Sequence, residues 1–94
     1  MKKINLTKLR EKIDTTDEDL MKVLAKRFAV TKMVGEYKKT HNLKACAKNR
    51  EEQVFKQRTI WAKEHHLNPI LIKQLFATII KEVRKNHRKI KNSE

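Results

Sequence analysis

The first part of the chain carries apolar side chains at helical spacing. They fall mostly three, four or seven residues apart, as one face of a helix requires: Leu9, Ile13, Leu20, Leu24, Phe28, Val34 and Tyr37. This pattern predicts one helix from Leu6 to about Lys39. At 1.5 Å per residue, some 34 helical residues would measure about 50 Å, which is longer than a compact domain of this size needs. We therefore expect this very long first helix to pack against a second chain.

A polar run interrupts the pattern and leaves an alternative open. Residues 15–19 are Thr-Thr-Asp-Glu-Asp, and Thr15 with Glu18 has the spacing of a capping box, which would start a new helix there. Because the apolar period continues on both sides of the run, we favour the continuous helix.

The pattern then predicts a loop and a second helix. Residues 40–45 have no regular apolar period and contain Asn42, as is typical of a loop. The second helix is expected from about Ala47 to His65. Its stripe consists of Val54, Arg58 and Trp61.

A third helix starts at a defined signal. Asn68 is a preferred N-cap residue, and Pro69 suits the first helical position. The helix is expected to reach about Lys89, with a frayed tail over residues 91–94. Its apolar stripe is Ile72, Leu75, Phe76, Ile79, Ile80 and Val83.

Composition supports an all-α fold. The 94 residues include one Gly and one Pro, which leaves little material for hairpins and tight turns. We expect a single domain over residues 1–94 with its core at about 6–90. A chain this short buries only about 60–65% of its unfolded surface, so association would add stability.

The net charge of +13 predicts an anionic partner without identifying it. Nucleic acid is the usual partner of such a charge, but the cations are scattered along all three predicted helices without a recognised nucleic-acid motif. We therefore disfavour nucleic acid and keep a basic helical nucleic-acid-binding module as the non-enzymatic alternative.

Other features place the chain in the cytoplasm, outside membranes. No apolar run approaches the ~20 residues that span a bilayer, and the basic start is followed by polar residues rather than by a signal-peptide core. The lone Cys46 has no intrachain disulfide partner. His65 and His66 are adjacent and so point about 100° apart on a helix, which does not suit a metal site. We expect no metal and no cofactor.

Charged side chains on the apolar stripes carry the functional signal, because burial of an unpaired charge is unfavourable. Arg27 and Lys38 lie on the stripe of the first helix, Arg50 precedes Val54 by one turn, and His87 continues the stripe of the third helix. Each basic side chain alone could reach solvent at the edge of its helix. Together with Glu51, however, they predict a pocket with excess positive charge that suits a small, multiply anionic ligand.

The order of these residues resembles the all-helical chorismate mutases, over about residues 6–90. The specific part is the spacing of the basic residues at 10, 27, 38 and 50, with Glu51 directly after the last. The rest of the pattern is Leu9, Glu11, Ile13, Asp14, Asp17, Leu20, Leu24, Gly35, His65-His66-Leu67, Leu75-Phe76 and Ile79-Ile80.

The resemblance implies an interlocked homodimer that rearranges chorismate, a dianion, to prephenate without a nucleophile or cofactor. In each site Arg10 would come from the partner chain, and Arg27 would bind a substrate carboxylate. Lys38 would meet a carboxylate and the ether oxygen, Arg50 would extend the cationic wall, and Glu51 would accept from the ring hydroxyl. Catalysis would then come from holding a compact conformer and stabilising charge on the ether oxygen.

Some positions depart from the family pattern. Ala47 stands where an Asp is frequent, so only its backbone could bind substrate, and Thr16 replaces an aliphatic residue. Val83 replaces a Ser that binds a carboxylate. His87 replaces a Gln or Glu that faces the ether oxygen, and alternatively it only ends the stripe near solvent. Isochorismate pyruvate lyase has a similar fold and pocket and is the alternative enzyme.

Overall fold

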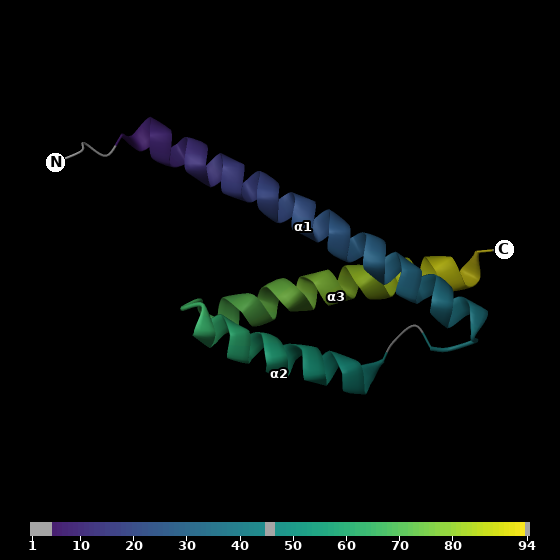
Figure 1. The fold of residues 1–94 in the computed structure, drawn as a ribbon. Helices are drawn as coiled ribbons and strands as arrows, with labels where there is room; N and C mark the ends of the chain where they lie inside the picture. Colours follow the sequence, from purple (N-terminus) through teal and green to yellow (C-terminus); the bar gives the residue numbers. More distant parts are fainter. Residues whose placement is uncertain (1–4, 45–46, 94) are drawn as a thin grey trace. The chain divides into compact units, whose positions relative to one another are not determined.

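Three helices make up the described part of the chain. The computed structural model describes residues 5–44 and 47–93. Its elements are α1 (Leu6–Thr40), α2 (Lys48–Glu64) and α3 (Pro69–Asn92), shown in Figure 1. No strand occurs among the described residues, so the predicted all-α class is confirmed. Cys46 lies outside these residues. The chain divides into two units, Met1–Thr31 and Lys32–Glu94.

The N-terminus of α1 is capped by a side chain. The Asn5 side-chain oxygen accepts a hydrogen bond from the Thr7 backbone N–H at 2.8 Å. This bond satisfies one of the N–H groups that the first helical turn leaves without a partner.

The polar run in α1 does not start a new helix. The Thr15 and Thr16 hydroxyls donate back to the carbonyls of Glu11 and Lys12, at 2.9 and 2.7 Å. Hydroxyl bonds to the fourth preceding carbonyl are compatible with an uninterrupted helix. The alternative of a capping box at Thr15 is therefore wrong, and α1 continues through the run.

The C-terminus of α1 is closed by a residue in left-handed conformation. Asn42 has a φ of 54°. The Leu43 N–H donates to the Lys38 carbonyl at 2.7 Å and the Asn42 N–H to the Lys39 carbonyl at 3.2 Å. This pair of bonds is a Schellman motif. It fixes the loop that the sequence predicted around Asn42.

α2 ends in the same way. His66 has a φ of 57°, the Leu67 N–H donates to the Ala62 carbonyl at 2.8 Å, and the His66 N–H to the Lys63 carbonyl at 3.2 Å. A chain with one Gly thus uses Asn and His where glycine is usual. The predicted bounds of α2 are confirmed to within one residue at each end.

The start of α3 is as predicted. Asn68 is its N-cap, with the side-chain oxygen accepting from the Ile70 N–H at 2.9 Å, and Pro69 begins the helix.

The end of α3 corrects the prediction. The helix continues to Asn92, beyond the expected end at Lys89. The Ser93 N–H and hydroxyl both donate to the Ile90 carbonyl, at 3.2 and 2.7 Å. The Lys39 ammonium bonds the Ser93 hydroxyl at 3.1 Å and also its carbonyl. These bonds explain why residues 91–92 do not fray.

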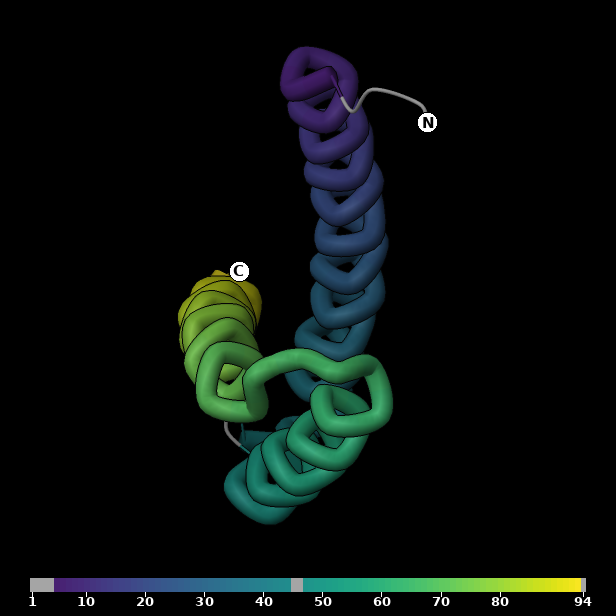
Figure 2. Tube along the Cα trace, turned by 90° about the vertical axis from the view of Figure 1, so that its left-hand side faces the viewer, coloured from purple at the N-terminus to yellow at the C-terminus, as the bar shows by residue number. Residues whose placement is uncertain are grey.

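The core of the second unit lies between α2 and α3, which run side by side (Figure 1 and Figure 2). Val54 and Ala62 on α2 and Ile79 and Ile80 on α3 are buried. On α3 the two buried isoleucines lie on the predicted stripe. On α2 the prediction is right for Val54 and wrong for Trp61, which is 45% exposed, whereas the buried Ala62 was not on the predicted stripe. No helix in residues 5–44 and 47–93 is long and apolar enough to cross a membrane.

The last turns of α1 touch α3 at a glycine. Gly35 is buried. A Cβ atom added to it would lie 2.7 Å from Cδ2 of His87 and 2.9 Å from Cδ1 of Ile90. The absence of a side chain at Gly35 is therefore what lets the histidine ring reach the backbone of α1.

Candidate functional site

The second unit holds most of the predicted site. Lys38 lies near the end of α1, Arg50 and Glu51 in the first turns of α2, and Val83 and His87 on α3. Arg10 and Arg27 belong to the first unit, where Arg10 is exposed and Arg27 half-buried. Their place in the pocket stays a prediction.

Glu51 is tied to α3 by an ion pair. Its carboxylate accepts the Nε–H of Arg84 at 2.7 Å through Oε2, and the Nη2–H of the same guanidinium through Oε1. Such two-point pairing fixes the plane of the carboxylate as well as its position. The Glu51 side chain is 15% exposed and that of Arg84 38%. The carboxylate therefore has a defined orientation between α2 and α3.

Arg84 was not among the residues singled out from the sequence. It lies off the apolar stripe, directly after Val83, where a basic residue is an ordinary surface residue. Its position relative to His87 could have drawn attention to it. Arg84 lies three residues before His87, and residues at this spacing are neighbours on a helix surface.

His87 is an interior residue. It is 5% exposed, and its ring lies against Gly35, with Cδ2 and Nε2 the atoms closest to where a Cβ would stand. The alternative that His87 only ends the stripe near solvent is therefore wrong. A buried imidazole is positioned by its neighbours, as a hydrogen-bonding group in a site must be.

Lys38 is half-buried and lies three residues after Gly35. Residues at this spacing share one helix face. Lys38 thus lies on the same side of α1 as the glycine against which His87 packs. Its backbone carbonyl is held by the bond from Leu43, which fixes the turn of helix that carries the ammonium.

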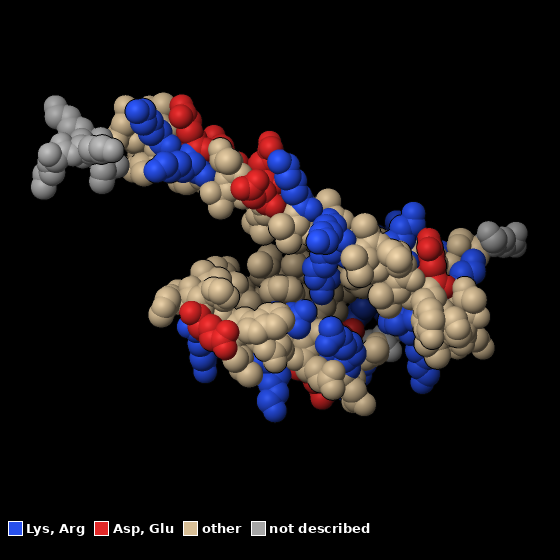
Figure 3. Space-filling view, in the orientation of Figure 1, with Lys and Arg blue, Asp and Glu red and all other residues tan. Residues whose placement is uncertain are grey.

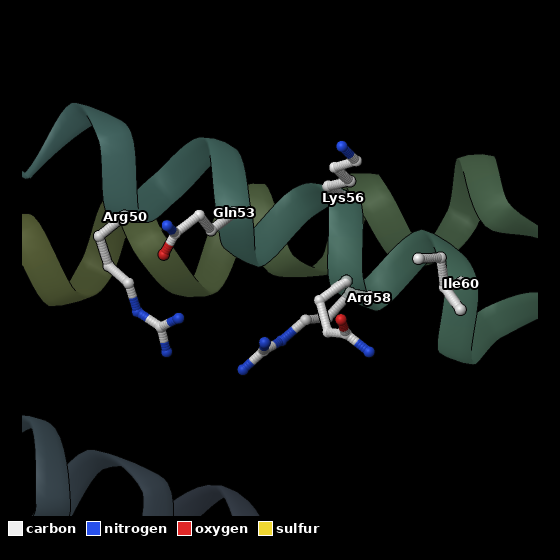
Figure 4. A pocket seen from close by; sticks show the side chains of 6 residues that line it. Arg50, Gln53, Lys56, Arg58 and Ile60 are labelled. Carbon is white, nitrogen blue, oxygen red and sulfur yellow. The ribbon is translucent and has the colours of Figure 1, made fainter.

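Arg50 lies at a pocket along α2 (Figure 4). The pocket has a volume of about 350 Å³. Arg50 and Arg58 project from the same side of α2 in the close view. The lining residues are Arg50, Gln53, Lys56, Gln57, Arg58 and Ile60. Of the predicted site residues the pocket includes Arg50 alone, so it is not by itself the whole predicted site.

The second arginine of this pocket is held by aromatic rings. The Arg58 guanidinium lies 4.9 Å from the centre of the Trp61 ring and 5.6 Å from that of Phe76. A guanidinium over an aromatic face is stabilised by the ring electrons. This contact explains how a cation occupies the apolar stripe of α2.

Ala47 and Val83 are the two apolar residues that depart from the family pattern. Ala47 is the N-cap of α2 without a side-chain capping bond, and its carbonyl accepts from the Glu51 N–H at 3.0 Å. Val83 is half-buried on α3. Neither side chain can donate to a carboxylate, so a substrate contact at Ala47 would have to use its backbone.

On the face that Figure 3 shows, the described residues form no single basic patch. On the face in Figure 3 the Lys and Arg side chains are spread over the helices, with Asp and Glu among them. Among the described residues, no three His, Cys, Asp or Glu side chains are grouped so that they could hold a metal ion.

Known proteins share this sequence pattern. Residues 9–88 match the family described as chorismate mutase type II. The chain is 30% identical over 77 residues to a 4-amino-4-deoxychorismate mutase of Streptomyces pristinaespiralis, covering 82% of this chain and 60% of that protein. It is 32% identical over 77 residues to a T-protein of Enterobacter agglomerans, covering 82% of this chain but 21% of that protein. The match over residues 9–88 shows that the chain belongs to the chorismate mutase type II family.

Proposed function

We propose that the chain is a chorismate mutase, an isomerase that rearranges chorismate to prephenate in the biosynthesis of aromatic amino acids. The family match carries this proposal, because residues 9–88 include every residue of the predicted site, from Arg10 to His87. The structure adds support because Glu51, His87 and Lys38 lie in one unit, where Arg84 holds the Glu51 carboxylate and His87 packs against Gly35.

The reaction needs positioning rather than a nucleophile. One bond forms and one breaks within a single molecule, so the protein has to hold the reacting carbons together and stabilise charge on the ether oxygen. Lys38 would donate to that oxygen, with His87 as a second donor. Arg27 and Arg50 would bind the carboxylates, and Glu51 would accept from the ring hydroxyl.

A homodimer completes the proposal. The first unit contains α1 alone among its described residues, so its apolar stripe has no second element of that unit to pack against. Four of its apolar side chains are between 41% and 60% exposed, namely Leu6, Leu9, Ile13 and Leu20. A second copy of the chain would cover this stripe and bring Arg10 to the partner's site. Sedimentation at micromolar concentration tests the dimer, and a stable folded monomer would contradict it.

A second candidate substrate is 4-amino-4-deoxychorismate, which the name of the Streptomyces pristinaespiralis relative specifies for that protein. It differs from chorismate by an amino group in place of the ring hydroxyl. The alternative lyase would instead release pyruvate from isochorismate. We place the enzyme in the cytoplasm because its lone cysteine suits a reducing compartment.

Turnover assays with product identification separate these functions. Purified protein is given chorismate, 4-amino-4-deoxychorismate or isochorismate, and substrate loss is followed at ultraviolet wavelengths. Prephenate is the product that we expect from chorismate. Lys38→Ala should lose activity, whereas Lys32→Ala, which removes an exposed lysine from the same helix, should not. Folded protein that turns over neither chorismate nor 4-amino-4-deoxychorismate would overturn the proposal, and pyruvate released from isochorismate would then identify the alternative lyase.

A further inference from the structure

The ion pair between Glu51 and Arg84 has a consequence for substrate choice that rests on the proposed function. In that function Glu51 accepts a hydrogen bond from the substituent on the substrate ring. The structure shows that the same carboxylate is already bound at both oxygens by one guanidinium. The question is which substituent such a carboxylate prefers.

The paired carboxylate can still accept. An ionised carboxylate has about four lone-pair positions, and a two-point arginine contact uses two of them. The remaining lone pairs point away from Arg84. Because the guanidinium fixes the plane of the carboxylate, it also fixes the direction in which these lone pairs can receive a donor. Arg84 therefore aims the acceptor without blocking it.

Pairing also changes the charge that the substrate meets. The ion pair of Glu51 with Arg84 has no net charge, and the positively charged Arg50 directly precedes Glu51 on α2. A neutral hydroxyl can still donate a hydrogen bond to the carboxylate, and its binding does not require a net negative charge there. An aliphatic amine carries a positive charge at neutral pH, and it would meet a carboxylate that Arg84 already neutralises. Like charges at short range disfavour binding.

We propose that Arg84 is a specificity-determining residue that makes Glu51 select a ring hydroxyl over a ring ammonium. Removal of the guanidinium would leave an unneutralised carboxylate, partly shielded from solvent, facing the substituent. Attraction between that carboxylate and an ammonium is strengthened where solvent is reduced. The preference between the two substrates should then move toward the amino compound.

The experiment compares kcat/KM for chorismate and 4-amino-4-deoxychorismate in matched variants. Arg84→Met and Arg84→Gln remove the charge in two ways, and Arg84→Lys retains it without the two-point contact. Arg88→Met removes an exposed arginine one turn further along α3 and is the control. Circular dichroism checks the helical content of each protein.

We expect the charge-removing variants to shift the ratio of the two kcat/KM values toward the amino substrate by at least about tenfold. Arg84→Lys should restore most of the original ratio, and Arg88→Met should leave it unchanged. An equal loss with both substrates, or an unchanged ratio in folded variants, would overturn the proposal while the mutase function stands. A wild-type protein that turns over neither compound would overturn the proposed function and this inference with it.

Discussion

Substitution of Gly35 by alanine tests the contact that brings α1 onto His87. The added methyl would lie 2.7 Å from Cδ2 and 3.2 Å from Nε2 of the imidazole, and 2.9 Å from Cδ1 of Ile90. The isoleucine methyl is the end of a flexible side chain and can rotate away. The imidazole is 5% exposed and has little free space, so the ring or the helix must move.

Two opposing terms set the magnitude. Alanine is favoured over glycine in a helix interior by about 1 kcal/mol, and Gly35 has no positive φ that would oppose it. Overfilling a packed interior costs about 1–3 kcal/mol. Because the nearest atoms belong to an enclosed ring, we expect the cost to exceed the gain. Gly35→Ala should lower the free energy of unfolding by up to about 2 kcal/mol.

A double-mutant cycle separates the two terms. In a His87→Ala background the ring is absent, so Gly35→Ala should raise the free energy of unfolding by about 0.5–1 kcal/mol. The measurement is urea unfolding followed by circular dichroism, at one chain concentration because association adds to stability. Equal effects of Gly35→Ala in both backgrounds, or a more stable single variant, would refute the packing argument.

Other changes test the site and the fold. Lys38→Ala should reduce turnover by about 10²- to 10³-fold, the usual loss for one donor to developing negative charge, and a negligible loss would show that the lysine is misplaced. Inactive Arg10→Ala and Lys38→Ala chains, once mixed, should regain activity in heterodimers if Arg10 acts across the dimer, and confirmed subunit exchange without recovery would exclude this. His87→Ala should lower turnover more than His87→Gln does, because glutamine keeps an amide that can donate a hydrogen bond. Equal turnover by folded His87→Ala and unsubstituted enzyme would show that the histidine is structural. Asn68→Ala should lower the free energy of unfolding by about 1 kcal/mol through loss of the N-cap bond, measured by the same urea titration.

Nucleic acid remains a testable alternative for the net charge of +13. Binding that depends on phosphate contacts weakens steeply as salt rises. Titration of duplex DNA at low and moderate salt measures this directly. We expect no specific binding, and tight association with a steep salt dependence would favour the non-enzymatic module.

Interactions between residues close in the sequence determine where the helices of this protein form. The apolar period predicted three helices, and Asn68 with Pro69 predicted the start of the third, because capping acts within a few residues. Val54 on α2 and Ile79 on α3 are buried as their predicted stripes required, whereas Trp61 on the α2 stripe is exposed. The spacing of the basic residues, including Lys38 and Arg50 with Glu51 directly after, indicated the resemblance to the family.

Only the tertiary structure decided which side chains meet across helices. Spacing within one helix cannot show that Arg84 binds Glu51, since the two residues are 33 positions apart and their approach depends on how α2 packs on α3. The same holds for His87 against Gly35 and for Lys39 on Ser93, which extended α3 beyond its predicted end. Each of these contacts joins two segments, and the local sequence of either segment gives no sign of the other. Their geometry is therefore set by packing of the helices, and it is packing that positions the acceptor and the buried imidazole.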